Sequence, residues 1–321
     1  ASPAAKPAAV RFGSPSAVSD AGIYIAIEKG YFKELGLDAQ AINFPSVAET
    51  VSPLAAGELE AAGGTLNTGL LNAIDRGVAL KIVTTKGSNL KGFDFSRLTV
   101  RRDLVDSGQL KEVKDLKGRK IAVPTARAGP EANIAYLLRQ AGLSVKDVEL
   151  VAMTFPDMVT AFANKAIDAA VHPEPTITSA VERGLAVRWP PGATSAIYGG
   201  EYQAGLLFFS EPFSKNTDAA RRFMVAYLRG LRDYNDAFAK NKDRAATVAM
   251  LAKYTPVKDA TLYDKMEMPY LQPDGKMHLQ SVKMDFDYFK EMGYYTGKLE
   301  LEKIVDTQFI EYAAQQLGPY K

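Results

Sequence analysis

The sequence predicts an α/β fold of two lobes joined by a two-crossing hinge, with a helical C-terminal third. Three observations predict it. Short strands alternate with helices over the first ninety residues, the alternation restarts near Arg97, and only helices follow Phe209. The length of 321 residues is too great for one simple core and suits two lobes.

The first lobe is expected to comprise residues 10–88 and 210–321, after a flexible leader at 1–9. Its strands are predicted at 10–14, 37–44, 58–64 and 80–85. Apolar residues on one face mark the intervening helices, and Ser46 with Glu49 forms a capping box for one of them. Pro53 should kink that helix because it has no N–H group. Connections this short favour a mostly parallel sheet.

The second lobe is expected at residues 89–209. Strands are predicted at 97–102, 120–124, 148–153, 167–171 and 203–209. Helices are predicted at 113–118, at 156–165, at 174–183 and after Pro130, a residue type common in the first turn of a helix.

Three apolar stripes at helical spacing mark the C-terminal third. They are Phe223, Tyr227, Leu228 and Leu231, then Leu279, Val282, Phe286 and Phe289, then Phe309, Tyr312, Ala313 and Leu317. These helices have no sheet of their own and must pack on existing lobes. The chain is therefore expected to leave the first lobe near Lys86 and return near Ser210, which creates a hinge and a cleft for a small ligand.

Composition excludes several classes of protein. A net charge of +2 gives no field that would recruit nucleic acid, and the longest apolar runs are too short to span a bilayer. The absence of cysteine excludes disulfides, thiolate metal sites, a cysteine nucleophile and an N-terminal lipid anchor. The Ala/Pro-rich start is typical of what remains after signal-peptide cleavage, although an artificially shortened chain would look the same. We expect a secreted, periplasmic monomer.

Several segments resemble a known family. Residues 28–37 (EKGYFKELGL), 54–59 (LAAGEL), 113–123 (VKDLKGRKIAV) and 166–170 (AIDAA), followed by Glu174-Pro175, occur in the order found in nitrate/sulfonate/taurine-binding proteins of ABC importers. This resemblance implies a periplasmic-binding-protein fold that delivers ligand to a membrane permease. The related thiamine-pyrimidine synthase depends on a cysteine-rich iron motif, which this sequence lacks.

Ligands of alternating α/β lobes bind at the carboxyl ends of strands, beside helix N-termini. In the first lobe, each candidate ligand residue also has a structural interpretation as a turn, cap or core residue. The candidates are Ser14, Ser16, Asp20 and Tyr24 in and after the first loop, Ser46 in the second, and Thr65, Asn67 and Thr68 in the third.

In the second lobe, the loop 125–130 opens a helix and carries a guanidinium. Thr125, Arg127 and Gly129 are candidates there, and we expect Arg127→Ala to weaken anion binding at least tenfold unless Arg127 is only solvated. Glu174 would accept hydrogen bonds from a ligand or satisfy the helix dipole, and a lone histidine such as His172 is more often structural. Tyr202 and Gln203 lie where the chain returns to the hinge.

We therefore predict a solute-binding protein that captures a small organic anion, such as an aliphatic or aromatic sulfonate or carboxylate, and delivers it to an ABC permease without chemistry. No metal or cofactor is expected. A protein that binds a pyrimidine precursor or another heterocycle, an enzyme on the same scaffold, and a sensory ligand domain remain alternatives. Ligand turnover would identify the enzyme, and a fused DNA-binding or membrane segment the sensor.

Overall fold

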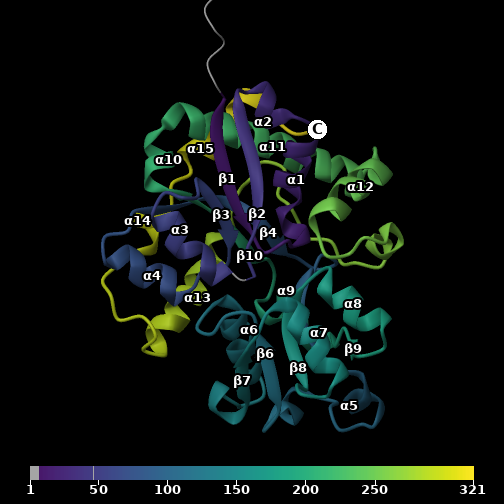
Figure 1. Ribbon diagram of the computed structural model, residues 1–321. Coiled ribbons are helices and arrows are strands. Elements are labelled where there is room, and N and C mark those ends of the chain that lie inside the picture. Colours follow the sequence, from purple (N-terminus) through teal and green to yellow (C-terminus); the bar gives the residue numbers. More distant parts are fainter. Residues whose placement is uncertain (1–6, 46) are drawn as a thin grey trace, which may run out of the picture.

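The computed structural model describes residues 7–45 and 47–321 and contains two mixed sheets of five strands each (Figure 1). One sheet lies above the other in this view, and helices surround both. We call the part of the chain built around the upper sheet the first lobe and the part built around the lower sheet the second lobe. The predicted fold of two α/β lobes with a helical C-terminal region is confirmed.

The first sheet has the strand order β2-β1-β3-β10-β4. Strand β1 is parallel to β2 and β3, whereas β10 runs antiparallel to its neighbours β3 and β4. The sheet is thus parallel except for the strand that enters from the second lobe. Its strands are β1 (Ala8–Ser14), β2 (Leu37–Asn43), β3 (Ala61–Gly64), β4 (Leu80–Asn89) and β10 (Tyr202–Ser210).

The second sheet repeats this plan with the order β7-β6-β8-β5-β9. Strand β6 is parallel to β7 and β8, and β5 is the antiparallel strand between β8 and β9. In each lobe, therefore, the fourth strand of the order opposes its neighbours. The strands are β5 (Ser96–Arg101), β6 (Lys120–Val123), β7 (Glu149–Ala152), β8 (Ala169–Pro173) and β9 (Ala186–Val187).

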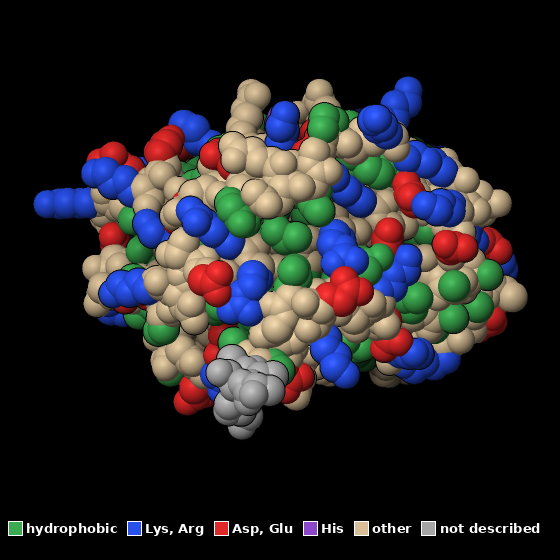
Figure 2. Space-filling view, turned by 90° about the horizontal axis from the view of Figure 1, so that it is seen from above, with side chains coloured by type: hydrophobic (Ala, Val, Ile, Leu, Met, Phe, Trp, Pro, Cys, Tyr) green, Lys and Arg blue, Asp and Glu red, His purple; other side chains and the backbone are tan. Residues whose placement is uncertain are grey.

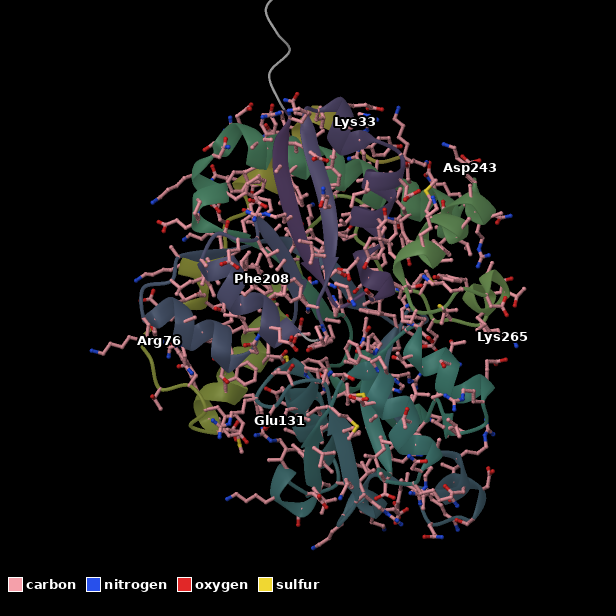
Figure 3. The ribbon with its side chains drawn as sticks, viewed as in Figure 1. Lys33, Arg76, Glu131, Phe208, Asp243 and Lys265 are labelled. Atoms are coloured by element: carbon pink, nitrogen blue, oxygen red, sulfur yellow. The ribbon has the colours of Figure 1, made fainter. Side chains whose placement is uncertain are left out.

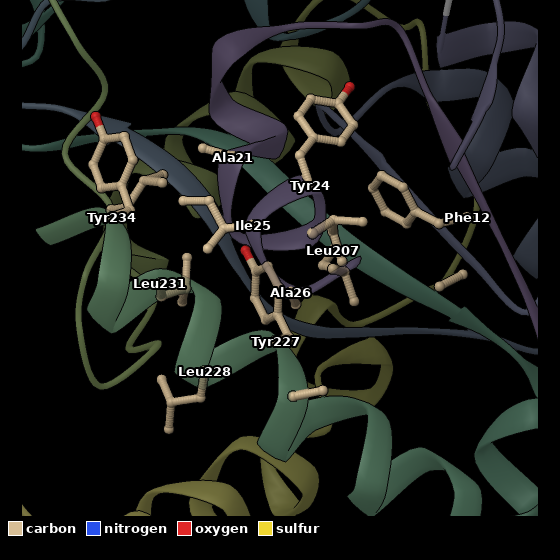
Figure 4. Packing of buried hydrophobic residues seen from close by; sticks show 14 of the residues in the cluster. Phe12, Ala21, Tyr24, Ile25, Ala26, Leu207, Tyr227, Leu228, Leu231 and Tyr234 are labelled. Carbon is tan, nitrogen blue, oxygen red and sulfur yellow. The ribbon is translucent and has the colours of Figure 1, made fainter. Parts of the chain in front are cut away.

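Helices from both ends of the chain cover the first sheet. On one face, α1 and α11 pack together, and Tyr227 and Leu231 of α11 lie beside α1 in the close view of Figure 4. Gly22 of α1 allows this approach because a Cβ there would lie 2.7 Å from both side chains. The helices are α1 (Ala21–Glu28), α2 (Tyr31–Glu34), α3 (Val51–Ala55), α4 (Thr68–Asp75), α10 (Glu211–Lys215), α11 (Thr217–Ala239), α12 (Arg244–Tyr254), α13 (Leu279–Glu291), α14 (Leu301–Ile304) and α15 (Gln308–Leu317).

The other face of the first sheet carries a second core that includes Leu70 of α4 and Phe289 of α13. Ala132 and Ala135 join this core although they belong to α6, a helix of the second lobe. In the second lobe, one face buries Trp189 and the other Phe162. Its helices are α5 (Arg102–Asp106), α6 (Gly129–Arg139), α7 (Phe155–Ala163), α8 (Thr176–Glu182) and α9 (Thr194–Ile197).

The structure differs from the sequence prediction in three places. Strand β10 pairs with β3 and β4, so residues 202–209, which we expected in the second lobe, lie in the first sheet. Ala8 and Ala9, expected in the leader, pair with Leu37 and Asp38 in β1–β2. Leu279 begins α13 but is 40% exposed, because the apolar stripe of this helix turns inward only from Val282 onward.

The chain crosses between the lobes twice, through residues 90–95 and 198–201. A third segment, residues 265–270, contacts both lobes. Ser88 and Tyr270 exchange backbone hydrogen bonds, and Arg97 of the second lobe reaches Glu267 at 3.3 Å. Lys265, labelled in Figure 3, lies at the level of the lobe boundary. The third segment thus packs on both lobes without crossing.

Basic and acidic side chains are interspersed over the face of the first lobe seen in Figure 2, as the small net charge leads one to expect. Among the described residues, none of the helices is both long enough and apolar enough to cross a membrane.

Candidate ligand-binding site

A cavity lies between the two lobes, at the loops that follow the strands. Its empty space, open solvent included, is about 640 Å³, and we call it the inner cavity. Residues of β4 and of the loops after β1 and β3 line it from the first lobe, and residues of β8 and of the loops after β6 and β7 line it from the second. The strand-end position that the sequence predicts is thus where the cavity lies.

The polar lining of the inner cavity consists of groups that can donate hydrogen bonds. Within the described chain, no carboxylate lines it, and the hydroxyls of Thr65, Ser96 and Thr125 have no hydrogen-bond partner. A ligand that presents acceptor oxygens would satisfy these groups. The polar side chains are Ser19, Thr65, Lys86, Ser96, Thr125 and His172.

Lys86 is the charged residue of this lining, and it is only 3% exposed. Its Nζ donates to Asp20 Oδ1 at 2.6 Å and to Ser19 Oγ at 3.1 Å. An ammonium has three N–H groups, so one remains for an acceptor in the cavity. Gly63 of β3, which β10 separates from β4, makes room for the lysine stem, because a Cβ there would lie 2.3 Å from Lys86 Cδ.

Asp20 holds this ammonium from behind and is fully buried. Its Oδ2 accepts from Ser14 Oγ at 2.6 Å, and Ser14 also contacts the hydroxyl of Tyr24 at 2.7 Å. Burial, with the charge of Asp20, raises the pKa of Tyr24 well above its usual value. These three predicted residues do not line the inner cavity; they hold Lys86, whose buried charge requires a partner.

His172 lines the inner cavity but is already bonded on both ring nitrogens. Nε2 lies 2.7 Å from Thr99 Oγ1, and Nδ1 lies 3.1 Å from Thr176 Oγ1. Burial, assisted by the charge of Arg188, lowers the pKa of His172 to about 3. The imidazole is therefore neutral at physiological pH and offers its ring to the cavity.

A second cavity of about 810 Å³, partly open to solvent, adjoins the first, and we call it the outer cavity. Both are lined by Pro15, Ala17, Pro45, Phe155 and Pro173. Ser16 lines the outer cavity, where its hydroxyl donates to Asn43 Oδ1 at 2.9 Å. Ser46, also predicted to contact ligand, lies outside the described residues.

Glu174 also lines the outer cavity, but its carboxylate is engaged. Oε1 accepts from Arg188 Nη2 at 2.6 Å, and Oε2 accepts from the backbone N–H of Thr178 at 2.9 Å. Burial raises the pKa of Glu174, and the adjacent guanidinium opposes that shift. Of the two roles left open by the sequence, the structural one accounts for these contacts.

The loops 63–69 and 125–130, from which we expected most ligand contacts, meet each other. Thr68 N donates to Arg127 O at 3.1 Å, and Gly129 N donates to Leu66 O at 3.2 Å. Asn67 caps α4 by accepting from Leu70 N at 2.9 Å. Thr68, Asn67 and Gly129 therefore join the lobes or shape their ends, and none of the three lines either cavity.

Arg127, predicted from the sequence to hold an anion, lies away from both cavities. Its guanidinium carbon lies 5.0 Å from the centre of the Tyr294 ring, and the side chain lines neither cavity. Arg127 has a left-handed backbone conformation, with φ 56°. Its backbone N–H donates to Glu131 Oε2 at 2.7 Å, and this local conformation directs the side chain toward Tyr294. Glu131 is labelled in Figure 3 at the boundary of the second lobe.

Tyr202 and Gln203 lie behind the inner cavity and do not line it. Gln203 Nε2 donates to Thr85 Oγ1 at 2.6 Å, and its Oε1 accepts from His278 N at 2.9 Å. Tyr202 donates to Asp285 Oδ2 at 2.9 Å. Both residues therefore fix β10 against its surroundings.

The structure thus brings Thr65, Thr125 and His172 to the inner cavity and Ser16 and Glu174 to the outer one. Sequence reasoning missed the residues that supply the charge and the aromatic walls. Its position directly after the predicted strand 80–85 was an available signal for Lys86. The missed residues are the charged Lys86 and the aromatic Phe95, Phe155 and Tyr254, together with the polar Ser19 and Ser96.

The chain matches the NMT1/THI5-like family over residues 18–237, more than half of its length. It belongs to this family. Relatives from Brucella abortus and Brucella suis, named only as binding proteins, are 29% identical over 238 residues, which is 74% of this chain and 68% of theirs. The family resemblance predicted from the sequence segments is confirmed.

Solved structures share the fold of this NMT1/THI5-like protein at low identity. The alkanesulfonate-binding protein SsuA of Xanthomonas axonopodis pv. citri, bound to MOPS, has a TM-score of 0.75 at 18% identity and covers 95% of this chain and 100% of its own. The periplasmic nitrate-binding protein NrtA of Synechocystis PCC 6803 has a TM-score of 0.78 at 14% identity, covering 97% and 89%. The desulfurization enzyme DSZB has a TM-score of 0.64 at 15% identity, covering 97% and 100%.

Proposed function

We propose that this protein is the solute-binding component of an ABC importer, which captures a small molecule between its lobes in the periplasm and delivers it unchanged to a membrane permease. The observation that carries the proposal is the inner cavity, which residues of both lobes line and in which three hydroxyls, those of Thr65, Ser96 and Thr125, have no hydrogen-bond partner in the described chain. Such a site binds ligand most tightly when the lobes are closed, and closure would then signal occupancy to the permease.

The ligand that fits this lining carries a compact acceptor group and an apolar body. Lys86 and the hydroxyls supply donors, while Phe95, Phe155 and Val171 supply apolar walls. A small organic anion such as a sulfonate or carboxylate, as the sequence suggested, has such a group. Its anchor would be Lys86 rather than Arg127. A heterocycle with a ring carbonyl is the second candidate, because the same donors would bind it.

Simple capture accounts for the chemistry of the lining better than catalysis does. The protonatable groups of the inner cavity are Lys86, which is paired with Asp20, and His172, which is neutral and bonded to two threonines. In the described chain, neither group forms a nucleophile–base pair with a side chain of the cavity. Because one fold neighbour is an enzyme, the test below includes turnover.

The test is native mass spectrometry of the purified protein, followed by identification of the released molecule and calorimetry with that compound. We expect one ligand per chain, recovered unchanged after prolonged incubation. Lys86→Met should weaken binding at least tenfold, since it removes a charge-assisted hydrogen bond. The control Lys283→Met removes an exposed lysine of α13 and should not. Conversion of the compound into product would contradict the proposal.

A further inference from the structure

Helix α6 of the second lobe is buried on two opposite faces. One face belongs to a core of its own lobe, and the other belongs to a core of the first lobe, where α13 packs against it. At 3.6 residues per turn, the two sets of side chains lie on opposite sides of the helix. The first set is Ile134, Leu137 and Leu138, and the second is Ala132 and Ala135. A helix that is apolar on both sides joins the two bodies between which it lies.

Polar side chains reinforce the contact between α6 and α13. The hydroxyl of Tyr136 on α6 donates to the carbonyl of Met284 at 2.9 Å, and the hydroxyl of Tyr288 on α13 donates to Glu131 Oε1 at 3.1 Å. The ring centre of Tyr136 also lies 5.3 Å from that of Tyr198, which belongs to the second crossing. Tyr288 and Glu131 are buried, so separating the helices would leave these polar groups without partners.

The first residue of α6 is also held against the first lobe. Gly129 approaches that lobe so closely that a Cβ there would lie 2.5 Å from the hydroxyl of Tyr202 and 2.8 Å from Asp285 Oδ2. Its backbone N–H donates to the carbonyl of Leu66 at 3.2 Å. Three parts of the first lobe, namely β10, α13 and the loop after β3, therefore hold the start of this second-lobe helix.

The two crossings continue this line of contacts to the third segment. Ser195, just before the second crossing, donates through its N–H and its hydroxyl to the carboxylate of Asp94 in the first crossing. The first crossing in turn contacts the third segment, where the ring centre of Phe93 lies 5.9 Å from that of Tyr270. Contacts between the lobes thus extend from the third segment through both crossings to α6 and α13.

The lobes face each other differently on the side of the outer cavity. Residues 15–17, 43–45 and 254–256 of the first lobe line this cavity together with the starts of α7 and α8. The hydrogen bonds of Ser16 and Tyr254 go to partners within the first lobe. In the part of the chain that the structure describes, no hydrogen bond or ion pair joins these three stretches to α7 or α8. A cavity, rather than a packed core, lies between the lobes here.

We propose that the lobes rotate about an axis that runs from the α6–α13 contact through the two crossings to the third segment, so that they separate only on the side of the outer cavity. In this motion α6 turns on α13 without leaving it, and the short side chains of Ala132 and Ala135 permit the small sliding that this requires. The inference rests on the proposed function, in which the lobes open and close, and it adds which contact persists and which side opens.

The experiment measures distances between spin labels in the full-length protein by double electron–electron resonance. The chain has no cysteine, so introduced pairs carry the only labels. Gln140→Cys with Lys283→Cys labels the end of α6 and α13, and Gln40→Cys with Thr160→Cys labels β2 and α7; all four positions are exposed. The protein is first unfolded in guanidinium and refolded, which removes any molecule that purified with it.

The two pairs should behave differently in the refolded protein. The Gln40/Thr160 distance should exceed the separation in the structure by several ångströms, the scale of a hinge opening. The Gln140/Lys283 distance should match the structure and give a narrow distribution, because these positions lie on helices that stay in contact.

A variant of α6 tests whether its contact with α13 holds the lobes together on this side. Ala135→Asp places a carboxylate among apolar side chains without a partner, so the Gln140/Lys283 distribution should broaden and shift to longer distances. Ala249→Asp on α12 is the matched control, because Ala249 is an exposed alanine within a helix, and it should leave the distribution unchanged. The two labelled pairs without further substitution decide the inference if Ala135→Asp fails to fold.

The outcomes distinguish the inference from the function on which it rests. Equal lengthening of both pairs overturns the inference, and so does a refolded protein in which both distances match the structure. A folded Ala135→Asp variant with an unchanged Gln140/Lys283 distribution also overturns it. In each case, one molecule per chain released unchanged in native mass spectrometry leaves the proposed function standing, whereas the absence of any such molecule together with immobile lobes overturns both.

Discussion

Asp285 offers the sharpest test of the energetics at the lobe boundary. It lies on α13 and is 3% exposed, and its carboxylate accepts hydrogen bonds from the hydroxyls of Tyr198 and Tyr202. In the described chain it has no cationic partner. Burial raises its pKa from 3.8 to about 7, and the two tyrosine hydroxyls only partly oppose that shift.

The consequence for stability follows from proton linkage. The folded protein holds a proton on Asp285 up to about pH 7, whereas the unfolded chain releases it near pH 4, so this group destabilises the fold as the pH rises between those values. The full difference is roughly 4 kcal/mol at 1.36 kcal/mol per pKa unit. Between pH 6 and pH 8, where the folded carboxyl ionises, the loss is about 1.4 kcal/mol.

The perturbation is Asp285→Asn, which keeps an acceptor for the tyrosines and removes the titration. Urea unfolding followed by circular dichroism at pH 6, 7 and 8 should show the wild type losing about 1.4 kcal/mol more than the variant over this range. Asp287→Asn on the same helix is the control, because Asp287 is exposed and paired with Lys283. Equal pH slopes for wild type and Asp285→Asn would refute the reasoning.

Three further substitutions test the assignments around the cleft. Arg127→Ala should change ligand affinity less than twofold in calorimetry, because its guanidinium stacks on Tyr294; the tenfold loss expected from sequence alone would return Arg127 to the site. Gly129→Ala should lower the unfolding free energy by roughly 1–3 kcal/mol, because its Cβ would lie 2.5 Å from the hydroxyl of Tyr202; an unchanged urea midpoint would contradict that contact. Glu174→Gln should lower the unfolding free energy by roughly 1–3 kcal/mol because Arg188 loses its charged partner, while Glu182→Gln, an exposed control, should lower it by less than half as much.

The fold was predictable because it depends on patterns that are local in the sequence. Alternating strand and helix signals placed the ends of most elements within two or three residues of their observed positions. The ends of the predicted strands also indicated where the cleft lies. The pairing of β10 was not predictable in the same way. An apolar strand fits either sheet by pattern, and its place between β3 and β4 depends on partners more than a hundred residues away.

The candidate site shows the same limit at the level of side chains. Sequence chemistry pointed to loops that contribute residues to the cavities, since hydroxyls and glycines gather where strands meet helix N-termini. It could not show which of these groups form hydrogen bonds within the protein. Asn67 caps its own helix, whereas Lys86 reaches the cavity only because Gly63 leaves room and Asp20 supplies a countercharge. Gly63 and Asp20 both come from segments of the chain distant from Lys86 in the sequence. Lys86 reaches the cavity here through neighbours that no local pattern contains, so its place there had to come from the three-dimensional packing.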